Sequence, residues 1–370
     1  MSNFTETDTR MMARALQVAR LGRYSAMPNP HVGCVLLRDG QVIAEGFTQA
    51  AGGNHAEIQA LQAAGDARGA TAYVTLEPCS HYGKTGPCAE ALIAAGVVRV
   101  VAAMEDPNPQ VTGQGLARLR AAGIEVSSGL LQDEAEQLIA GFIARMRRGR
   151  GRVRAKLAMS LDGRSAMASG ESQWITGPAA RQDVQRLRAS SCAIITGVGT
   201  VLADDCSLTV RAAELALPAD MAEQACARQP LRVVMDSRLQ SPRTAKVLDS
   251  TAPSLLCHAE STEVPAALLD CDRLPLPRTD NGLDLQPLMA ELNRRQCNEI
   301  LVESGPRLAG AMLQAGLLDE LLVYMAPTLM GSLAQPLLHL PLNEMSEKVP
   351  LQIRDLRQIG QDLRFTLIPG

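Results

Sequence analysis

The stretch NHAEIQALQAAGDARGATAYVTLEPCSHYGKTGPC, residues 54–88, decides how the first half of the chain folds. From His55 onward it reads as a helix that ends near Gly65. Residues 72–76 predict a strand, and a second helix begins at Cys88 after a loop with glycine and proline. A helix, a strand, a loop and a second helix in this order predict an α/β unit.

Four side chains of this stretch supply the parts of a zinc-dependent hydrolytic deaminase. His55, Cys79 and Cys88 offer one imidazole and two thiolates, and a catalytic zinc takes three protein ligands with one position left open. Such a zinc lowers the pKa of bound water, so that hydroxide is available near neutral pH. Glu57 is expected to carry a proton from that water to the leaving ammonia. The predicted helix start at Cys88 favours a thiolate there.

The spacing of the two cysteines leaves alternatives open. Eight residues separate Cys79 from Cys88, whereas the general deaminase signature has two residues between its cysteines. Two plainer interpretations are that the cysteines are small core residues and that the zinc is only structural. His81 is either a further ligand or a loop residue that contacts the substrate. The remaining cysteines lack such neighbours and are expected to be ordinary thiols.

Helices and strands alternate through the rest of the first half. A helix is expected at 8–22, with Asp8 or Thr9 as its N-cap. Asp39-Gly40 stands between two apolar runs, which predicts a hairpin of strands 32–38 and 41–45. Four further elements are expected after the zinc motif: a strand at 97–103, a helix at 114–122, a strand at 124–127 and a helix at 133–146.

The composition predicts a globular protein of two domains and excludes several kinds of partner. The chain has 370 residues, of which 46% are hydrophobic, 2% are aromatic and 20% are charged, with a net charge of −3. Without a basic cluster or many aromatic rings, a nucleic-acid partner is not expected. No run approaches the roughly eighteen apolar residues of a membrane span, and no signal peptide is recognised. Nine scattered cysteines predict a reduced, cytoplasmic protein.

A basic, glycine-rich break, RRGRGR at 147–152, predicts a domain boundary that leaves residues 1–149 in the first domain and 150–370 in the second. The second half starts a new α/β pattern, and its residues 240–280 are rich in proline and ambiguous. Its strands are expected at 153–159, 192–196, 231–236, 299–303 and 319–325, and its helices at 179–189, 284–295 and 307–315.

Two glycine-containing turns follow predicted strands in the second half, GVGT at 197–200 and SGPR at 304–307. Glycine lets backbone approach a ligand closely, and a helix N-terminus favours phosphate. Neither turn has the spacing of the dinucleotide-binding fingerprint. The pattern alone leaves two interpretations open for each, a ligand-binding turn or a plain turn.

Taken together, the motifs of both halves resemble the bifunctional riboflavin-biosynthesis deaminase/reductase family, which also has the longer cysteine spacing. In the first half the motifs are PNP at 28–30, HAE at 55–57, EPCSH at 77–81, TGPC at 85–88 and DPNP at 106–109. In the second half they are KLAMSLDG at 156–163, SGESQWIT at 169–176, TVLADD at 200–205, LTVR at 208–211 and VESGP at 302–306.

The resemblance implies a fold and two reactions. The fold would be an N-terminal cytidine-deaminase-like α/β/α layer domain and a C-terminal dihydrofolate-reductase-like α/β domain. The first would hydrolyse the 2-amino group of a diaminopyrimidinone ribosylamine phosphate, with Zn²⁺ on His55, Cys79 and Cys88 and with Glu57 moving the proton. The second would then reduce the ribosyl group to ribityl with NADPH.

The resemblance also implies contacts in the second half and a homo-oligomer, either a dimer or a tetramer. Arg188 and Arg211 suit a substrate phosphate because guanidinium groups are always charged and bind in a bidentate way. The implied NADPH contacts are Ala158, Trp174, Thr200, Asp204, Ser237, Gly305, Pro306, Arg307, Leu308, Ala309, Gly310 and Ala311. The implied substrate contacts are Ser172, Arg188, Leu208, Arg211 and Glu303.

Two other functions compete with this interpretation. One is a nucleoside or nucleic-acid deaminase with an unrelated C-terminal domain, which the missing basic face and the second-half motifs argue against. The other is a zinc-stabilised binding module without catalysis, in which Glu57 would have no essential role.

Overall fold

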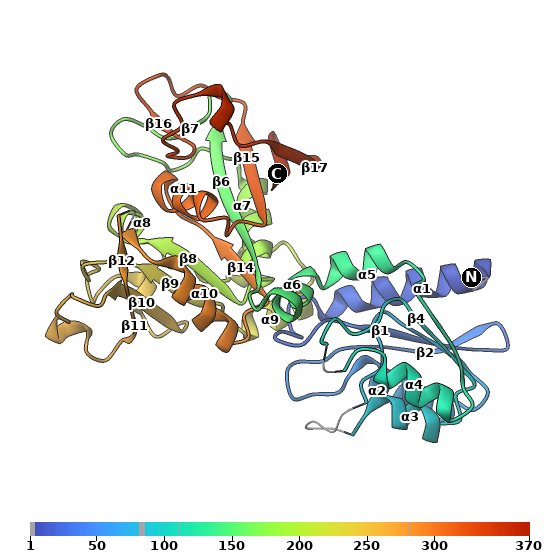
Figure 1. Ribbon diagram of the computed structural model, residues 1–370. Helices are drawn as coiled ribbons and strands as arrows, with labels where there is room; N and C mark the ends of the chain where they lie inside the picture. The colour runs from blue at the N-terminus through green and yellow to red at the C-terminus, as the bar shows by residue number, and fades with distance from the viewer. Residues whose placement is uncertain (1–3, 81–85, 110, 281) are drawn as a thin grey trace. The chain divides into compact units, whose positions relative to one another are not determined.

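The computed structural model describes residues 4–80, 86–109, 111–280 and 282–370. The chain forms two units, Met1–Gly149 and Arg150–Gly370, and each contains its own sheet with helices (Figure 1). The α/β class predicted for both halves is therefore confirmed. His81 lies outside the described residues.

The first unit is built on a five-stranded mixed sheet in the order β2-β1-β3-β4-β5. Its strands are β1 (Gly33–Arg38), β2 (Gln41–Phe47), β3 (Thr71–Val74), β4 (Arg99–Ala102) and β5 (Glu125–Ser128). β1 pairs antiparallel with β2 and β3, while β3, β4 and β5 are parallel. Asp39 and Gly40 have positive φ angles of 52° and 77°, as a tight two-residue hairpin requires.

Helices cover both faces of this sheet (Figure 1). α2 (Ala56–Ala64), α3 (Cys88–Ala94) and α4 (Gln114–Ala121) lie on one side, and α1 (Glu6–Ala19) and α5 (Gln132–Leu138) lie on the other. The helix expected at 133–146 is in fact two, because the backbone departs from helical geometry at Ile139 before α6 (Ala140–Arg148). A short 3-10 turn, Arg20–Gly22, follows α1.

Two glycines let helices approach the sheet closely. A Cβ atom on Gly33 of β1 would lie 2.0 Å from the carbonyl oxygen of Ala15 in α1. On Gly46 of β2 it would lie 2.3 Å from the carbonyl oxygen of Ala56 in α2. Neither position can hold a side chain without moving a helix.

Asp8 anchors α1 to the sheet rather than capping it. The N-cap is Thr5, whose hydroxyl accepts from the Asp8 N–H, while the Asp8 carboxylate accepts from the Thr5 N–H. The Asp8 carboxylate is only 1% exposed and also receives hydrogen bonds from Tyr73 at 2.8 Å and Arg99 at 2.6 Å. The N-cap is therefore three residues before Asp8, the first candidate, and the capping box lets α1 start at Glu6 rather than at residue 8.

The second unit is built on a nine-stranded sheet in the order β11-β10-β9-β8-β14-β6-β15-β18-β17. The first seven in this order are parallel, and the C-terminal hairpin of β18 and β17 adds an antiparallel edge. The strands are β6 (Arg152–Ser160), β8 (Ala193–Gly197), β9 (Leu231–Met235), β10 (Ser254–Ala259), β11 (Asp272–Leu276), β14 (Glu299–Val302), β15 (Glu320–Ala326), β17 (Leu351–Ile359) and β18 (Asp362–Pro369). Two small pairs stand apart, β7 (Arg164–Ala166) with β16 (Gln335–Pro336) and β12 (Arg278–Thr279) with β13 (Gly282–Leu283).

The described helices of this unit include three that the sequence pattern predicts and two, Val198–Asp204 and Ala219–Ala227, that it does not. They are α7 (Pro178–Ala189), α8 (Val198–Asp204), α9 (Ala219–Ala227), α10 (Leu285–Arg294) and α11 (Pro306–Gln314). The expected turn at 197–200 is the start of α8, with Gly197 as its N-cap. The ambiguous stretch 240–280 contains β10 and β11, and the C-terminal hairpin had no counterpart in the sequence pattern.

Replacing Asp8 by Asn tests the anchor. We expect the free energy of unfolding to fall by about 3 kcal/mol at neutral pH, because Arg99 loses its buried partner. Arg99 holds the pKa of the Asp8 carboxyl well below its usual range, so this stabilisation is present above about pH 4 and is lost as the pH falls further. Urea denaturation across this range should show wild type and variant converging in acid.

Asp66→Asn is the matched control, because Asp66 forms an exposed ion pair with Arg68 at 3.3 Å. Its effect should stay within about 0.5 kcal/mol. A similarly small effect of Asp8→Asn would show that the anchor contributes nothing.

Candidate active sites

Three side chains of the 54–88 stretch meet at one point in the first unit. His55 is the N-cap of α2, Cys79 follows β3, and Cys88 is the first residue of α3. The Nδ1 atom of His55 lies 3.6 Å from the Sγ of Cys79 and 3.3 Å from the Sγ of Cys88. The backbone N–H of Cys88 donates to the Sγ of Cys79 at 3.4 Å. The potential ligand atoms all lie within 4.8 Å of one another.

This donor set fits a zinc ion. With zinc bonds of about 2.0 Å to nitrogen and 2.3 Å to sulfur, tetrahedral geometry places N and S about 3.5 Å apart. The separations of 3.3 and 3.6 Å match that value. Hydrogen bonding from Cys88, and then from His55, lowers the pKa of the Cys79 thiol, which favours the thiolate that a metal needs. The same hydrogen bond, together with burial, raises the pKa of the Cys88 thiol, so the helix start alone does not make Cys88 a thiolate.

Glu57 lies beside this cluster on the first turn of α2 and is 4% exposed. Burial raises the pKa of its carboxyl to about 7, and the negative charge of Cys79 acts in the same direction. A carboxyl group that titrates near neutral pH can both accept and donate a proton there.

Glu77, the residue before the Pro78-Cys79 pair, organises the loops around the site. One carboxylate oxygen accepts from the N–H groups of Asp106 and Gly113, both at 2.9 Å. The other accepts from the N–H groups of Gly115 at 2.8 Å and Leu116 at 3.3 Å. The side chain is 5% exposed, so its charge is balanced by four backbone donors and by the N-terminus of α4.

A pocket of about 310 Å³ opens over the cluster. His55, Glu57 and Cys79 lie in its wall with polar groups from two proline-containing loops and with the end of α6. Its described lining is Asn29, Pro30, Val32, Thr48, His55, Glu57, Leu76, Glu77, Cys79, Asp106, Asn108, Val111, Phe142, Arg145 and Met146. The pocket therefore combines a hydrolytic centre with amide groups that can orient a polar ring.

In the second unit, a charged cluster lies where the chain order of the parallel sheet reverses. β14 lies between β8 and β6, and ligands of open α/β sheets bind at the carboxyl ends of strands around such a point. Glu303 directly follows β14, and its carboxylate accepts from the Arg188 guanidinium at 2.6 and 2.8 Å. Burial acts to raise the pKa of Glu303, but Arg188, with Lys156 and Arg211, lowers it overall. Lys156 and the two arginines thus lie near two carboxylates, Glu303 and Glu214, and the guanidinium groups can also bind an anionic ligand.

The residues expected to contact NADPH lie mostly along the same edge of the sheet. Ala158 is in β6, Thr200 and Asp204 are in α8 directly after β8, and Ser237 follows β9. Gly305 is the N-cap of α11, and Leu308 lies near Gly197 at the end of β8. The first turns of α11 also carry Pro306, Arg307 and Ala311. Two further residues of this helix are buried, Ala309 and Gly310, and Gly310 lies against the backbone of His339.

Trp174 is placed differently, in the loop between β7 and α7. Its ring is 70% exposed, and the Arg181 guanidinium lies 4.7 Å from the ring centroid. Ser172 is in the same loop and is half-buried. No contact joins these two to the charged cluster among those described.

The residues expected to contact substrate divide into two groups. Arg188 and Glu303 form an ion pair. Arg211 lies close enough to lower the pKa of Glu303, and it also forms an ion pair with Glu214 at 2.5 Å. Leu208 has a positive φ of 53° and packs its side chain into the core at 3% exposure. Only the backbone of Leu208 is therefore available to a ligand.

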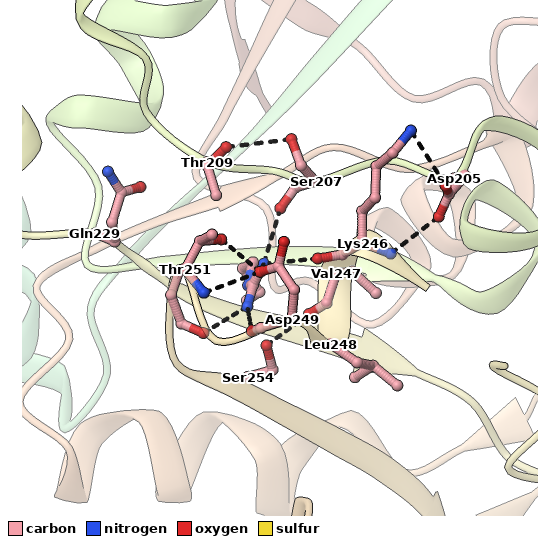
Figure 2. A network of polar contacts seen from close by, with 12 residues as sticks. Asp205, Ser207, Thr209, Gln229, Lys246, Val247, Leu248, Asp249, Thr251 and Ser254 are labelled. Atoms are coloured by element: carbon pink, nitrogen blue, oxygen red, sulfur yellow. Dashed lines mark hydrogen bonds and ion pairs between the residues drawn. The ribbon is translucent and has the colours of Figure 1, made fainter. Parts of the chain in front are cut away.

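A buried arginine ties the segment after α8 to the rest of the sheet. Arg232 of β9 is fully buried and donates to the carbonyl oxygens of Ser207 (3.4 Å), Lys246 (3.0 Å), Asp249 (2.6 Å) and Ala252 (2.5 Å). It also donates to the Asp249 carboxylate at 2.9 Å. Figure 2 shows Ser207, Lys246 and Asp249 gathered in this network, with Asp205 bonded to Lys246 at its margin.

Two family models match the chain. The cytidine and deoxycytidylate deaminase zinc-binding region matches residues 5–104. The RibD C-terminal domain matches residues 152–365, which is more than half of the chain. The chain belongs to the RibD family.

Relatives and solved structures of the RibD family agree along the whole length. Riboflavin biosynthesis protein RibD of Escherichia coli is 51% identical over 366 residues, covering 98% of this chain and 99% of that protein. The Acinetobacter baumannii RibD structure, form 1, is 45% identical with a TM-score of 0.90, and covers 99% of both chains. A Thermotoga maritima structure described as a diaminohydroxyphosphoribosylaminopyrimidine deaminase/5-amino-6-(5-phosphoribosylamino)uracil reductase is 31% identical with a TM-score of 0.86, covering 98% of this chain and 99% of that one.

This RibD-family chain is therefore a bifunctional deaminase and reductase of riboflavin biosynthesis, as its motifs predicted. The two family matches also confirm the two cofactors, zinc and NADPH. The match of the second unit contradicts an unrelated C-terminal domain, and the enzyme family contradicts a binding module without catalysis. In the described part of the chain, no helix combines the length and apolar character needed to cross a bilayer.

Sequence reasoning missed three residues that the structure brings to these sites. Glu77 belongs to the EPCSH motif, which predicts no structural role for it. Arg145 falls in a polar helix and had no local signal, and Arg232 falls inside an otherwise apolar strand. An arginine within the buried strand LRVVM was the available hint for Arg232, since a buried charge needs partners.

Replacing Glu77 by Gln tests its organising role. An amide puts a donor where two backbone N–H groups point, so we expect the free energy of unfolding of the first unit to fall by roughly 2–3 kcal/mol. Deamination should slow because Asp106 and Asn108 line the pocket on a loop that Glu77 holds. Urea denaturation and a deamination assay on the same preparation measure both effects.

Glu90→Gln is the matched control, since Glu90 forms a half-exposed ion pair with Arg118 in the same unit. We expect a change within about 0.5 kcal/mol and normal turnover. Equal effects of the two substitutions would contradict a special role for Glu77.

Proposed function

We propose that residues 1–149 deaminate a diaminopyrimidinone ribosylamine phosphate and that residues 150–370 reduce the ribosyl group of the product with NADPH. The observation that carries the proposal is the cluster of half-buried His55 and Cys79 with buried Cys88 and Glu57 at a ligand-sized pocket. The charged cluster around Glu303 supports the second reaction.

In the deaminase unit, His55, Cys79 and Cys88 would hold zinc and Glu57 would move the proton. Bound zinc supplies a hydroxide nucleophile by lowering the pKa of water. Glu57 would take up a proton from water and pass it to the amino group, which would leave as ammonia while the ring carbon becomes a carbonyl. The side-chain amides of Asn29 and Asn108 lie in the pocket wall, where they can hold the pyrimidine ring in place.

In the reductase unit, the carboxyl edge of the sheet would hold cofactor and substrate side by side. NADPH supplies the hydride for the open-chain form of the sugar. Ala158, Trp174, Thr200, Asp204, Ser237 and residues 305–311 would contact NADPH. Ser172, Arg188, Leu208, Arg211 and Glu303 would contact substrate, with both arginines on its phosphate and the Glu303 carboxylate fixing the Arg188 fork.

A homo-oligomer in a reducing cytoplasm is the proposed setting. The edge strand β17 exposes Leu351, Ile353 and Leu356, and an exposed apolar edge strand favours pairing with another chain. None of the nine cysteines forms a disulfide. Both observations support the proposal.

Glu57→Gln separates the chemistry from the metal site. We expect the deamination kcat to fall about a hundred- to ten-thousandfold, because the amide cannot shuttle a proton. Zinc content should be unchanged because Glu57 is not one of the proposed ligands. Ammonia release and metal analysis on the same sample test this, and normal turnover would remove Glu57 from the mechanism.

Cys88→Ala is the companion variant. It should lose zinc and deamination while still oxidising NADPH when supplied with the deaminated intermediate. Loss of both activities would contradict independent sites.

Arg211→Ala tests the phosphate contact in the reductase. Arg211 is exposed and pairs with Glu214 on the surface, so folding should be unaffected. We expect the KM for the deaminated intermediate to rise about tenfold with little change in kcat, since one charged hydrogen bond to phosphate is lost. NADPH oxidation measures this, with Arg243→Ala, another exposed ion-paired arginine, as the control. An unchanged KM would exclude the contact.

A further inference from the structure

The deaminase pocket has an uneven distribution of charge. Its described lining carries three carboxylates, those of Glu57, Glu77 and Asp106. Among the described lining residues, Arg145 is the one with a permanent positive charge. The mechanism described above gives Arg145 no role.

Arg145 is presented to the pocket by a well-packed helix end. It lies in the last turn of α6, and its guanidinium is 5.8 Å from the ring centroid of Phe142 in the preceding turn. Phe142 and Met146 line the same pocket, so one face of α6 forms a wall with Arg145 in it. Arg145 is half-buried, which limits its mobility and partly shields its charge from solvent.

The proposed substrate brings a charge that the carboxylates of the pocket would repel. A phosphate monoester carries about two negative charges at neutral pH. The reacting ring carbon must lie at His55 and Glu57, so the phosphate lies at a distance from them along the pocket. A guanidinium group matches phosphate oxygens with two parallel hydrogen bonds.

We propose that Arg145 binds the phosphate of the deaminase substrate and makes this site selective for a phosphorylated nucleotide over the free nucleoside. The inference rests on the proposed function, because it concerns the same pocket and the same substrate. It gives the chain two separate phosphate sites, with Arg145 in the first unit and Arg188 with Arg211 in the second. The same phosphate is then recognised before deamination and again before reduction.

Arg145→Ala in the full-length, zinc-loaded enzyme tests the inference. Deamination is measured with the diaminopyrimidinone ribosylamine phosphate and with its dephosphorylated form. We expect the KM for the phosphorylated substrate to rise about ten- to a hundredfold, and the KM for the dephosphorylated form to stay unchanged. Arg145→Lys should retain part of the discrimination, because it keeps the charge but loses the fork.

Ribose 5-phosphate serves as a substrate-independent probe. It should inhibit the wild-type deaminase competitively, and its inhibition constant should rise in Arg145→Ala by about the same factor as the KM. Arg148→Ala is the matched control, since Arg148 is an exposed arginine of the same helix outside this pocket. It should behave as wild type with both substrates and with the probe.

Several results would overturn the inference. An equal rise of KM for both substrates in Arg145→Ala would assign Arg145 to the shape of the pocket, and no change would exclude it from binding. Zinc content and NADPH oxidation with supplied intermediate verify that the variant is folded. If the wild type deaminates neither substrate, the proposed function itself fails; if it deaminates the phosphate and only the variant result disagrees, the proposed function stands without Arg145.

Discussion

The carboxylate of Glu77 is the interaction on which the first active site depends. Four backbone N–H groups converge on its two oxygens, so one side chain fixes the end of β3, the loop at Asp106 and the start of α4. Cys79 is two residues further on, and its position follows from that fixed strand end. Glu77 thereby sets the distance between the cysteine thiols and the polar wall of the pocket, although it neither binds metal nor reacts.

In the second unit, buried arginine side chains hold the neighbouring loops by hydrogen bonds. Arg232 satisfies four backbone carbonyls and one carboxylate from two loops, and so holds the segment that carries Ser207 and Leu208. Arg188 forms a buried ion pair with Glu303, which lies at the carboxyl end of β14. In both units a buried charged side chain has several hydrogen-bonding partners close by, as burial in a low dielectric favours.

The sequence predicts the site residues that are marked by their type and spacing. It does not predict roles that arise only when residues distant in sequence come together in the fold. His55, Glu57, Cys79 and Cys88 could be found because zinc chemistry restricts the residue types and helix starts position them. The roles of Glu77, Arg145 and Arg232 depend on partners 14 to 39 residues away or on a shared cavity, so no local pattern marks them. The hairpin of β17 and β18 was missed because a bulge between Ile353 and Asp355 interrupts the alternation that identifies a strand. The sequence predicts a turn where α8 begins, because Gly197 at its N-cap and Gly199 in its first turn are poor helix formers.

The close approach of α1 and α2 to the sheet restricts how this family can vary. Every codon change that replaces Gly33 or Gly46 adds a Cβ atom, and the space for it is already occupied by helix backbone. Any side chain at these two positions would clash with helix backbone, whatever its polarity or charge. α2 carries His55 and Glu57 at its start, so a shift of that helix would displace a ligand and the proton carrier together. Gly33 and Gly46 touch neither metal nor substrate, yet the deaminase requires both. We therefore expect natural variants of this protein to retain them.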